Sequence, residues 1–109
     1  MKAKVRVTRG SGNVFADLGL PNPEERLAKA GLASEIERII RERGLSQANA
    51  AKVLGIDQPK ISALRNGRLS GFSVERLIRF LNALDRDVEI VVKAKPRSRQ
   101  RGQLLVKAA

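Results

Sequence analysis

The stretch from Leu45 to Gly67 constrains this chain most, because it holds two short helical patterns separated by a single glycine. Ser46 can cap a first helix, and Gly55 can end it by taking a positive φ. Asp57 can cap a second helix, whose apolar residues lie three apart on one face. Few architectures other than a helix-turn-helix require two helices at this spacing, so we predict that motif here.

A unit this small cannot bury its own apolar surface, so the flanking segments must support it. Asn22, Pro23 and Glu25 predict the start of a long helix, with Asn22 as N-cap and Glu25 completing a capping box. This helix is predicted to end at Gly44, and Gly31 is a position where it could kink or break. Its predicted core-facing residues are Leu27, Ala30, Ala33 (or Leu32), Ile36, Ile39 and Ile40, and those of the helix-turn-helix include Ala51, Leu54, Ile61 and Leu64.

A further supporting helix is predicted to begin at Ser73, after a loop whose Phe72 returns to the core. The β-branched stretch Val88–Val92 then predicts one short strand. A single strand has no ladder to join, so we expect Val88, Ile90 and Val92 to pair with the same strand of a second subunit. The predicted fold class is therefore all-α, with about five helices, one C-terminal β-strand and a homodimeric assembly.

The absence of cysteine and histidine from the chain disfavours an enzyme, because it removes thiolate chemistry and the commonest general base. The carboxylates are interpreted as helix caps and solvated faces, so we expect no catalytic residue, no metal and no cofactor. No apolar run approaches the roughly 18 residues that suggest a membrane span, and the first nine residues lack a signal-peptide core. A cytoplasmic protein without membrane partners is expected.

The positive charge is concentrated at the ends of the chain. Of the net charge of +11, residues 1–22 carry +3, residues 23–92 carry +2 and residues 93–109 carry +6. Such a distribution favours binding to a polyanion, and nucleic acid is the polyanion we expect first. The alternative is that the basic tails only keep the chain soluble. Residues 93–109 are predicted to form a basic disordered tail. The sequence assigns no partner to the apolar residues 104–106.

Residues 1–21 are predicted to be a flexible N-terminal segment that contains an apolar patch of Val14, Phe15, Leu18 and Leu20. The patch is too short to form a core of its own. It either packs back on the domain or docks on another protein, and the pattern alone leaves both open.

The residues S-Q-A-N-A-A-K-V-L-G-I-D-Q-P-K-I-S-A-L-R-N-G resemble the lambda-repressor-like (XRE) helix-turn-helix family. Within that family, the flanking V-F-A-D-L-G-L-P-N-P-E-E and L-S-G-F-S-V-E-R-L-I-R-F-L-N-A-L-D-R-D-V-E-I resemble HigA-type antitoxins, over roughly residues 14–92. The resemblance implies a protein that silences a RelE/HigB-like mRNA endonuclease toxin and, as a dimer, represses their shared operon. Two residues depart from the wider family: Pro59 replaces a polar side chain, and Arg65 stands where Glu is frequent.

In a helix-turn-helix of this kind the second helix enters the major groove of a double-stranded operator. Gln58 can bond adenine, and Lys60 can reach guanine or a phosphate. The alternative is that both are merely solvated polar groups. The predicted base contacts are Gln58, Lys60, Ser62, Ala63 and Arg65, and the predicted phosphate contacts are Ser46, Gln47, Asn66 and Arg68.

The resemblance shifts the interpretation of the N-terminal patch toward toxin docking. Toxins of this class are usually basic, so apolar burial must dominate such an interface with a chain of charge +11. The domain prediction is then a toxin-binding segment (1–21), a DNA-binding and dimerisation domain (22–92) and the tail (93–109). Three alternatives are a stand-alone phage-type transcriptional regulator, a small nuclease and a nonspecific nucleic-acid-binding protein.

Overall fold

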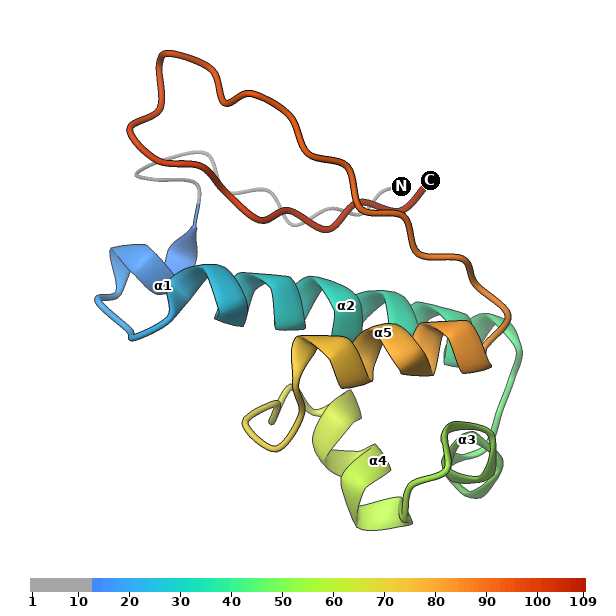
Figure 1. The fold of residues 1–109 in the computed structure, drawn as a ribbon. Coiled ribbons are helices and arrows are strands. Elements are labelled where there is room, and N and C mark those ends of the chain that lie inside the picture. The colour runs from blue at the N-terminus through green and yellow to red at the C-terminus, as the bar shows by residue number, and fades with distance from the viewer. Residues whose placement is uncertain (1–12) are drawn as a thin grey trace.

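The structure, a computed structural model, describes residues 13–109, and within them the chain forms five helices (Figure 1). The helices are α1 (Val14–Asp17), α2 (Pro23–Glu42), α3 (Gln47–Leu54), α4 (Gln58–Arg65) and α5 (Val74–Ala83). Helices α3 and α4 are the predicted helix-turn-helix, and α2 and α5 are its predicted supports. The all-α fold class is confirmed.

Helix α2 is the longest element, and it runs without a break through Gly31. Leu32 and Ala33, which the sequence offers as alternatives for one core-facing position, are both buried. Gly31 has a packing role instead, because a Cβ at this position would lie 2.8 Å from the Cβ of Val106. Only glycine leaves room for that side chain on the helix surface.

The core lies where α5 packs along α2 and where both cover the helix-turn-helix. Its fully buried large side chains include Ile36, Ile40, Ile61, Leu77 and Leu84. As predicted, Phe72 returns to this core, where its ring meets that of Phe80 edge to face with centroids 5.9 Å apart. The motif is therefore held by residues on both sides of it in the sequence.

Three of the predicted helix starts have the geometry that the sequence indicates. The side-chain oxygens of Ser46, Asp57 and Ser73 accept hydrogen bonds from the backbone N–H three residues later, at 3.0, 2.9 and 3.0 Å. Gly55 ends α3 with φ 71°, in the left-handed region where glycine is unstrained. The turn between α3 and α4 is therefore specified by local chemistry.

The predicted capping box at the start of α2 is wrong. Asn22 occupies the N-cap position, but its φ of 50° puts it in the left-handed region and its side chain makes no cap bond. The side chain of Asn13 lies nearby instead: its Nδ2 donates to the carbonyl of Pro23 at 2.9 Å, and its Oδ1 accepts from the N–H of Phe15 at 2.9 Å. Asn13, expected in a flexible link, is buried and joins α1 to α2.

The predicted C-terminal strand is also wrong, because residues 13–109 contain no strand. A stretch with high β-propensity needs a neighbour to complete its hydrogen bonds, and the described residues supply none. Val88 is half-buried against the core of its own chain, whereas Ile90 and Val92 are 79% and 92% exposed.

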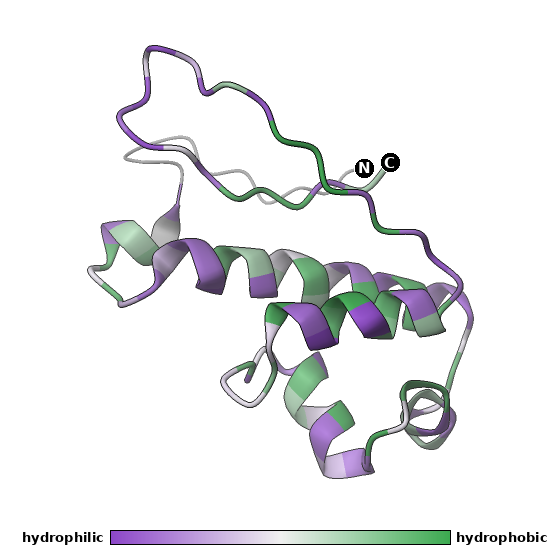
Figure 2. Ribbon diagram, in the orientation of Figure 1, coloured by the Kyte–Doolittle hydropathy of each residue, from purple (hydrophilic) through white to green (hydrophobic). Residues whose placement is uncertain are grey.

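The tail after α5 continues without helix or strand and crosses back over α2 (Figure 1). Figure 2 shows that this tail begins with hydrophilic residues, continues with an apolar stretch, and has a second apolar stretch near its end after a long hydrophilic part. Val106 is half-buried against the core, a contact that the sequence did not predict. Of the helices that the structure describes, none is long and apolar enough to cross a membrane.

Candidate DNA-binding surface

Helix α4 rests on the core by one face only. Ile61 and Leu64 are 0% and 3% exposed, so they fix the helix against the rest of the domain. Gln58, Pro59 and Lys60 form its first turn and are exposed. The Asp57 cap and the glycine-ended α3 hold this turn at the surface, where a second molecule can reach it.

The start of α4 brings together predicted base and phosphate contacts. Gln58 and Lys60 lie on α4, and Ser46 and Gln47 lie at the start of α3. The Nε2 atom of Gln47 lies 3.5 Å from the carbonyl oxygen of Gln58, which is a long contact but places the two helix starts side by side. All four residues are exposed, and they combine amide, hydroxyl and ammonium donors.

The other predicted contacts lie farther along α4. Ser62 and Ala63 are half-buried, and Ala63 also packs against the core, so its outward surface is small. Asn66 and Arg68 are exposed beyond the end of the helix, where the Nδ2 of Asn66 donates to the Oγ of Ser62 at 3.3 Å. An eight-residue helix is about 12 Å long, so these two groups suit a different phosphate from those near Ser46.

Arg65 is not brought together with the other predicted base contacts. Its Nε and Nη2 donate to the two carboxylate oxygens of Glu37 on α2, at 2.7 and 3.0 Å. The hydrogen bonds from Arg65 are the main reason that the pKa of Glu37 lies below its usual value, and the same contact raises the pKa of Arg65. Arg41 adds a second, more exposed ion pair to Glu37 at 3.2 Å.

This contact ties the end of α4 to α2 through Arg65. A guanidinium bound by both oxygens of a carboxylate uses two of its five N–H donors and is held in a fixed plane. Glu37 lies 28 residues before Arg65 in the chain and belongs locally to a charged helix face, so no sequence spacing marks it as the partner.

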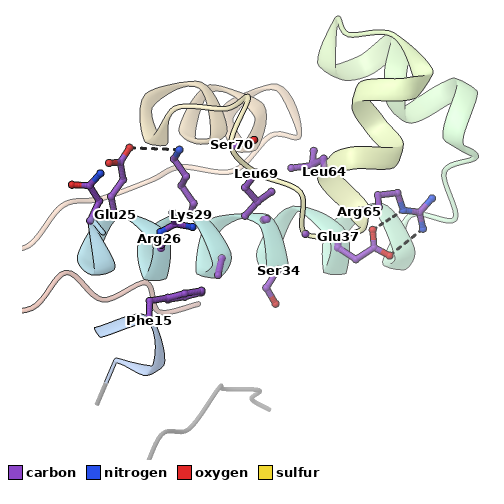
Figure 3. Close-up of a pocket in the computed structure, with 14 residues that line it drawn as sticks. Phe15, Glu25, Arg26, Lys29, Ser34, Glu37, Leu64, Arg65, Leu69 and Ser70 are labelled. Atoms are coloured by element: carbon purple, nitrogen blue, oxygen red, sulfur yellow. Dashed lines mark hydrogen bonds and ion pairs between the residues drawn. The ribbon is translucent and has the colours of Figure 1, made fainter. Parts of the chain in front are cut away.

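The ion pair lies at one end of a groove of about 550 Å³ between α2 and the segment that follows α4 (Figure 3). Phe15 of the N-terminal patch lines the groove together with Ala30, Leu64 and Leu69. Its charged lining residues are Glu25, Arg26, Lys29, Glu37 and Arg65, and Lys29 pairs with Glu25 at 3.5 Å.

The N-terminal patch is divided by the structure. Phe15 is half-buried beside α2, whereas Leu18 and Leu20 are 68% and 38% exposed. The side chain of Val14 and the basic residues before Asn13 lie outside the described part. Within residues 13–109, no three acidic side chains gather to form a metal site.

Comparisons with known proteins agree with this geometry. Residues 14–93 match a family model described as "Helix-turn-helix domain". A solved structure named "Putative XRE Family Transcriptional Regulator" is 57% identical, with a TM-score of 0.76, and the match covers 82% of this chain and 100% of that one. Nothing matches among curated proteins.

Proposed function

Because the chain belongs to the XRE family of helix-turn-helix proteins, we propose that it is a sequence-specific, DNA-binding transcriptional regulator. The observation that supports this most is the exposed first turn of α4, which carries Gln58 and Lys60 beside the donors of Ser46 and Gln47. The core buries only the opposite face of α4, so the helix is free to enter a groove.

In this proposal the first turn of α4 enters the major groove, which is wide enough for a helix. The Gln58 amide bonds the N7 and N6 atoms of an adenine, and the Lys60 ammonium reaches a guanine or a phosphate. The DNA phosphates on either side of the groove are held by Ser46, Gln47, Asn66 and Arg68. These contacts set the position of the protein along the duplex without reading its sequence.

The test begins with selection of a preferred duplex from a random pool by the full chain. Affinities are then measured for that duplex and for a scrambled one at one fixed salt concentration. Gln58→Ala should weaken the preferred duplex by about tenfold or more and leave the scrambled one unchanged, since a bidentate base contact contributes about 1–3 kcal/mol. Arg68→Ala should weaken both equally. Equal losses from the two variants on both duplexes would refute this division.

A homodimer is part of the proposal, because two copies of so small a reading helix on a palindrome give more specificity than one. The exposed apolar run Ile90, Val91 and Val92, at 79%, 72% and 92% exposure, is the surface we assign to that contact. Wild type should sediment as a dimer at micromolar concentration and Ile90→Asp as a monomer. A monomeric wild type would exclude the dimer.

Toxin neutralisation is a second, finer proposal, with a RelE/HigB-like endonuclease as the partner. It is supported by Leu18 and Leu20, which remain exposed although α1 packs on α2. Burial of such side chains contributes about 1.5–3 kcal/mol each, so apolar contact rather than charge attraction would hold an interface between two basic proteins.

The alternative is a stand-alone regulator in which α1 merely completes the core, and the half-buried Phe15 favours it. Co-purification with the product of the adjacent gene separates the two. The toxin proposal expects capture by wild type and loss with Leu18→Glu plus Leu20→Glu, while DNA binding persists. Undiminished capture by the double variant would remove Leu18 and Leu20 from the toxin interface.

A further inference from the structure

Residues 93–101 form a basic loop in the tail. A basic residue stands at every second position, and no acidic residue occurs anywhere in residues 93–109. Lys93, Lys95, Arg97 and Arg101 are exposed, and Arg99 is half-buried. This concentration of charge is outside the helix-turn-helix.

The basic loop is held in place on the domain. After the loop, Val106 packs on the surface that Gly31 leaves open. The Nη2 of Arg101 lies 3.2 Å from a carboxylate oxygen of Glu24 at the start of α2. Inside the loop, the Nζ of Lys95 donates to the carbonyl of Arg99 at 2.7 Å. The tail is therefore attached along α2 rather than extending freely from α5.

The face of α2 that carries the tail lies away from the reading helix. At 100° per residue, Gly31 is about 140° from Ile36 and about 180° from Ile40, both of which are fully buried. Figure 1 shows the same arrangement, with the tail on one side of α2 and with α3 and α4 on the other. A duplex held by α4 and a phosphate strand held by the basic loop would thus be on opposite sides of the domain.

We propose that the basic loop 93–101 is a second DNA-binding surface, which takes the backbone phosphates of a duplex segment separate from the one at α4. One protein molecule then bridges two duplex segments. A duplex is the partner because the loop supplies closely spaced cations for its phosphates, and residues 93–109 contain no aromatic ring on which unpaired bases could stack. The proposal rests on DNA binding by α4.

The test is a bridging assay with the full chain. A biotinylated 30-bp duplex of the selected sequence is fixed on beads, protein is added, and retention of a fluorescent 30-bp scrambled duplex is measured between 50 and 200 mM salt. Wild type should retain the second duplex. Lys95→Gln plus Arg97→Gln should lower retention by about tenfold and reduce the slope of log affinity on log salt by about 2.

The matched control is Arg79→Gln plus Arg86→Gln, which removes the same amount of charge from one residue in α5 and one just after it. It should retain the second duplex within twofold of wild type. Gly31→Ala changes no charge, but its Cβ displaces Val106. It should lower bridging while binding of the first duplex is unchanged.

The outcomes separate this inference from the proposed function. If wild type binds the first duplex and retains no second one, the bridging inference is wrong and the regulator stands. If wild type binds neither duplex, DNA binding itself fails. Equal retention by wild type and by the Lys95/Arg97 variant would show that two α4 helices, one from each subunit, hold the two duplexes. If poly-glutamate displaces the fluorescent duplex and added scrambled duplex does not, the loop binds an acidic protein instead.

Discussion

The two ends of α4 have different surroundings although they are less than two turns apart. Gln58 and Lys60 at the start are exposed and make no side-chain contact that fixes them to the core. Arg65 at the end is bound to Glu37 of α2 through two hydrogen bonds. A short helix can thus present one end to DNA because its other end is tied to the longest helix of the domain.

This comparison teaches that polarity alone does not identify a reading residue. Arg65 looks like a better base contact than Gln58, since Arg is the commonest specific reader of guanine. Its partner Glu37 makes that contact costly, because a charge-paired guanidinium would have to give up two strong hydrogen bonds first. Variants along α4 should therefore separate into those that change stability and those that change DNA preference.

The largest expected effect lies between the two ends, at Ile61. Ile61→Ala removes a fully buried side chain and should lower the free energy of unfolding by about 2–5 kcal/mol, with a midpoint loss of about 10 °C or more in thermal denaturation. Lys60→Ala, one residue away and exposed, should change it by less than about 0.5 kcal/mol. Similar losses from both would contradict the one-sided packing of α4.

The next largest effect on stability is expected at the end of α4 that carries Arg65. Arg65→Gln or Glu37→Gln should each lower the free energy of unfolding by about 1–2 kcal/mol in urea titrations. Arg65→Gln leaves the partly buried Glu37 with only the exposed Arg41 as an ion-pair partner, and Glu37→Gln leaves Arg65 without its carboxylate. The double variant should lose clearly less than the sum, since the second change removes no further interaction. Additive losses would show that the pair is not coupled.

The same pair predicts a pH dependence. The bonds from Arg65 hold the pKa of Glu37 below its ordinary value of 4.5, so the carboxylate stabilises the fold fully above that pH. This contribution is lost as the pH falls below 4.5, through the lowered pKa. The stability advantage of wild type over Glu37→Gln should be constant from pH 6 to 7 and should shrink below pH 4.5. An advantage that persists to pH 2 would contradict the assignment.

Among variants that remove an interaction, the smallest stability effect is expected at the start of α4. Asp57→Ala removes the N-cap of α4 and should lower the free energy of unfolding by about 1 kcal/mol. Asp57→Asn keeps an accepting oxygen and should change stability by less than about 0.5 kcal/mol, while binding all duplexes more tightly because one negative charge near the phosphates is gone. If Asp57→Asn leaves DNA affinity unchanged, Asp57 lies too far from the DNA phosphates for its charge to affect binding.

The sequence predicts what is local in this fold. Ser46, Gly55, Asp57 and Ser73 act within a few residues of themselves, and each has the conformation that its chemistry favours. Asn22 fails as a cap because the chain before it is set by the distant bond between Asn13 and Pro23. Local chemistry cannot reveal such a contact.

The other failures have the same cause. The Glu37–Arg65 pair and the Val106–Gly31 contact join residues far apart in the chain, so no spacing rule marks them. The stretch after α5 has the composition of a strand but finds no ladder among residues 13–109. The exposed start of α4 can be predicted, because the second helix of a helix-turn-helix presents its N-terminal turn at the surface.

The most direct test of this account is a complete base-substitution profile of the selected duplex, measured for wild type, Gln58→Ala and Arg65→Gln. We expect Gln58→Ala to lose discrimination at one base pair without a change in thermal stability, and Arg65→Gln to keep the wild-type profile while its melting temperature falls. If Arg65→Gln loses discrimination at a base pair and melts like wild type, Arg65 reads DNA and the division of α4 into a reading end and a holding end is wrong.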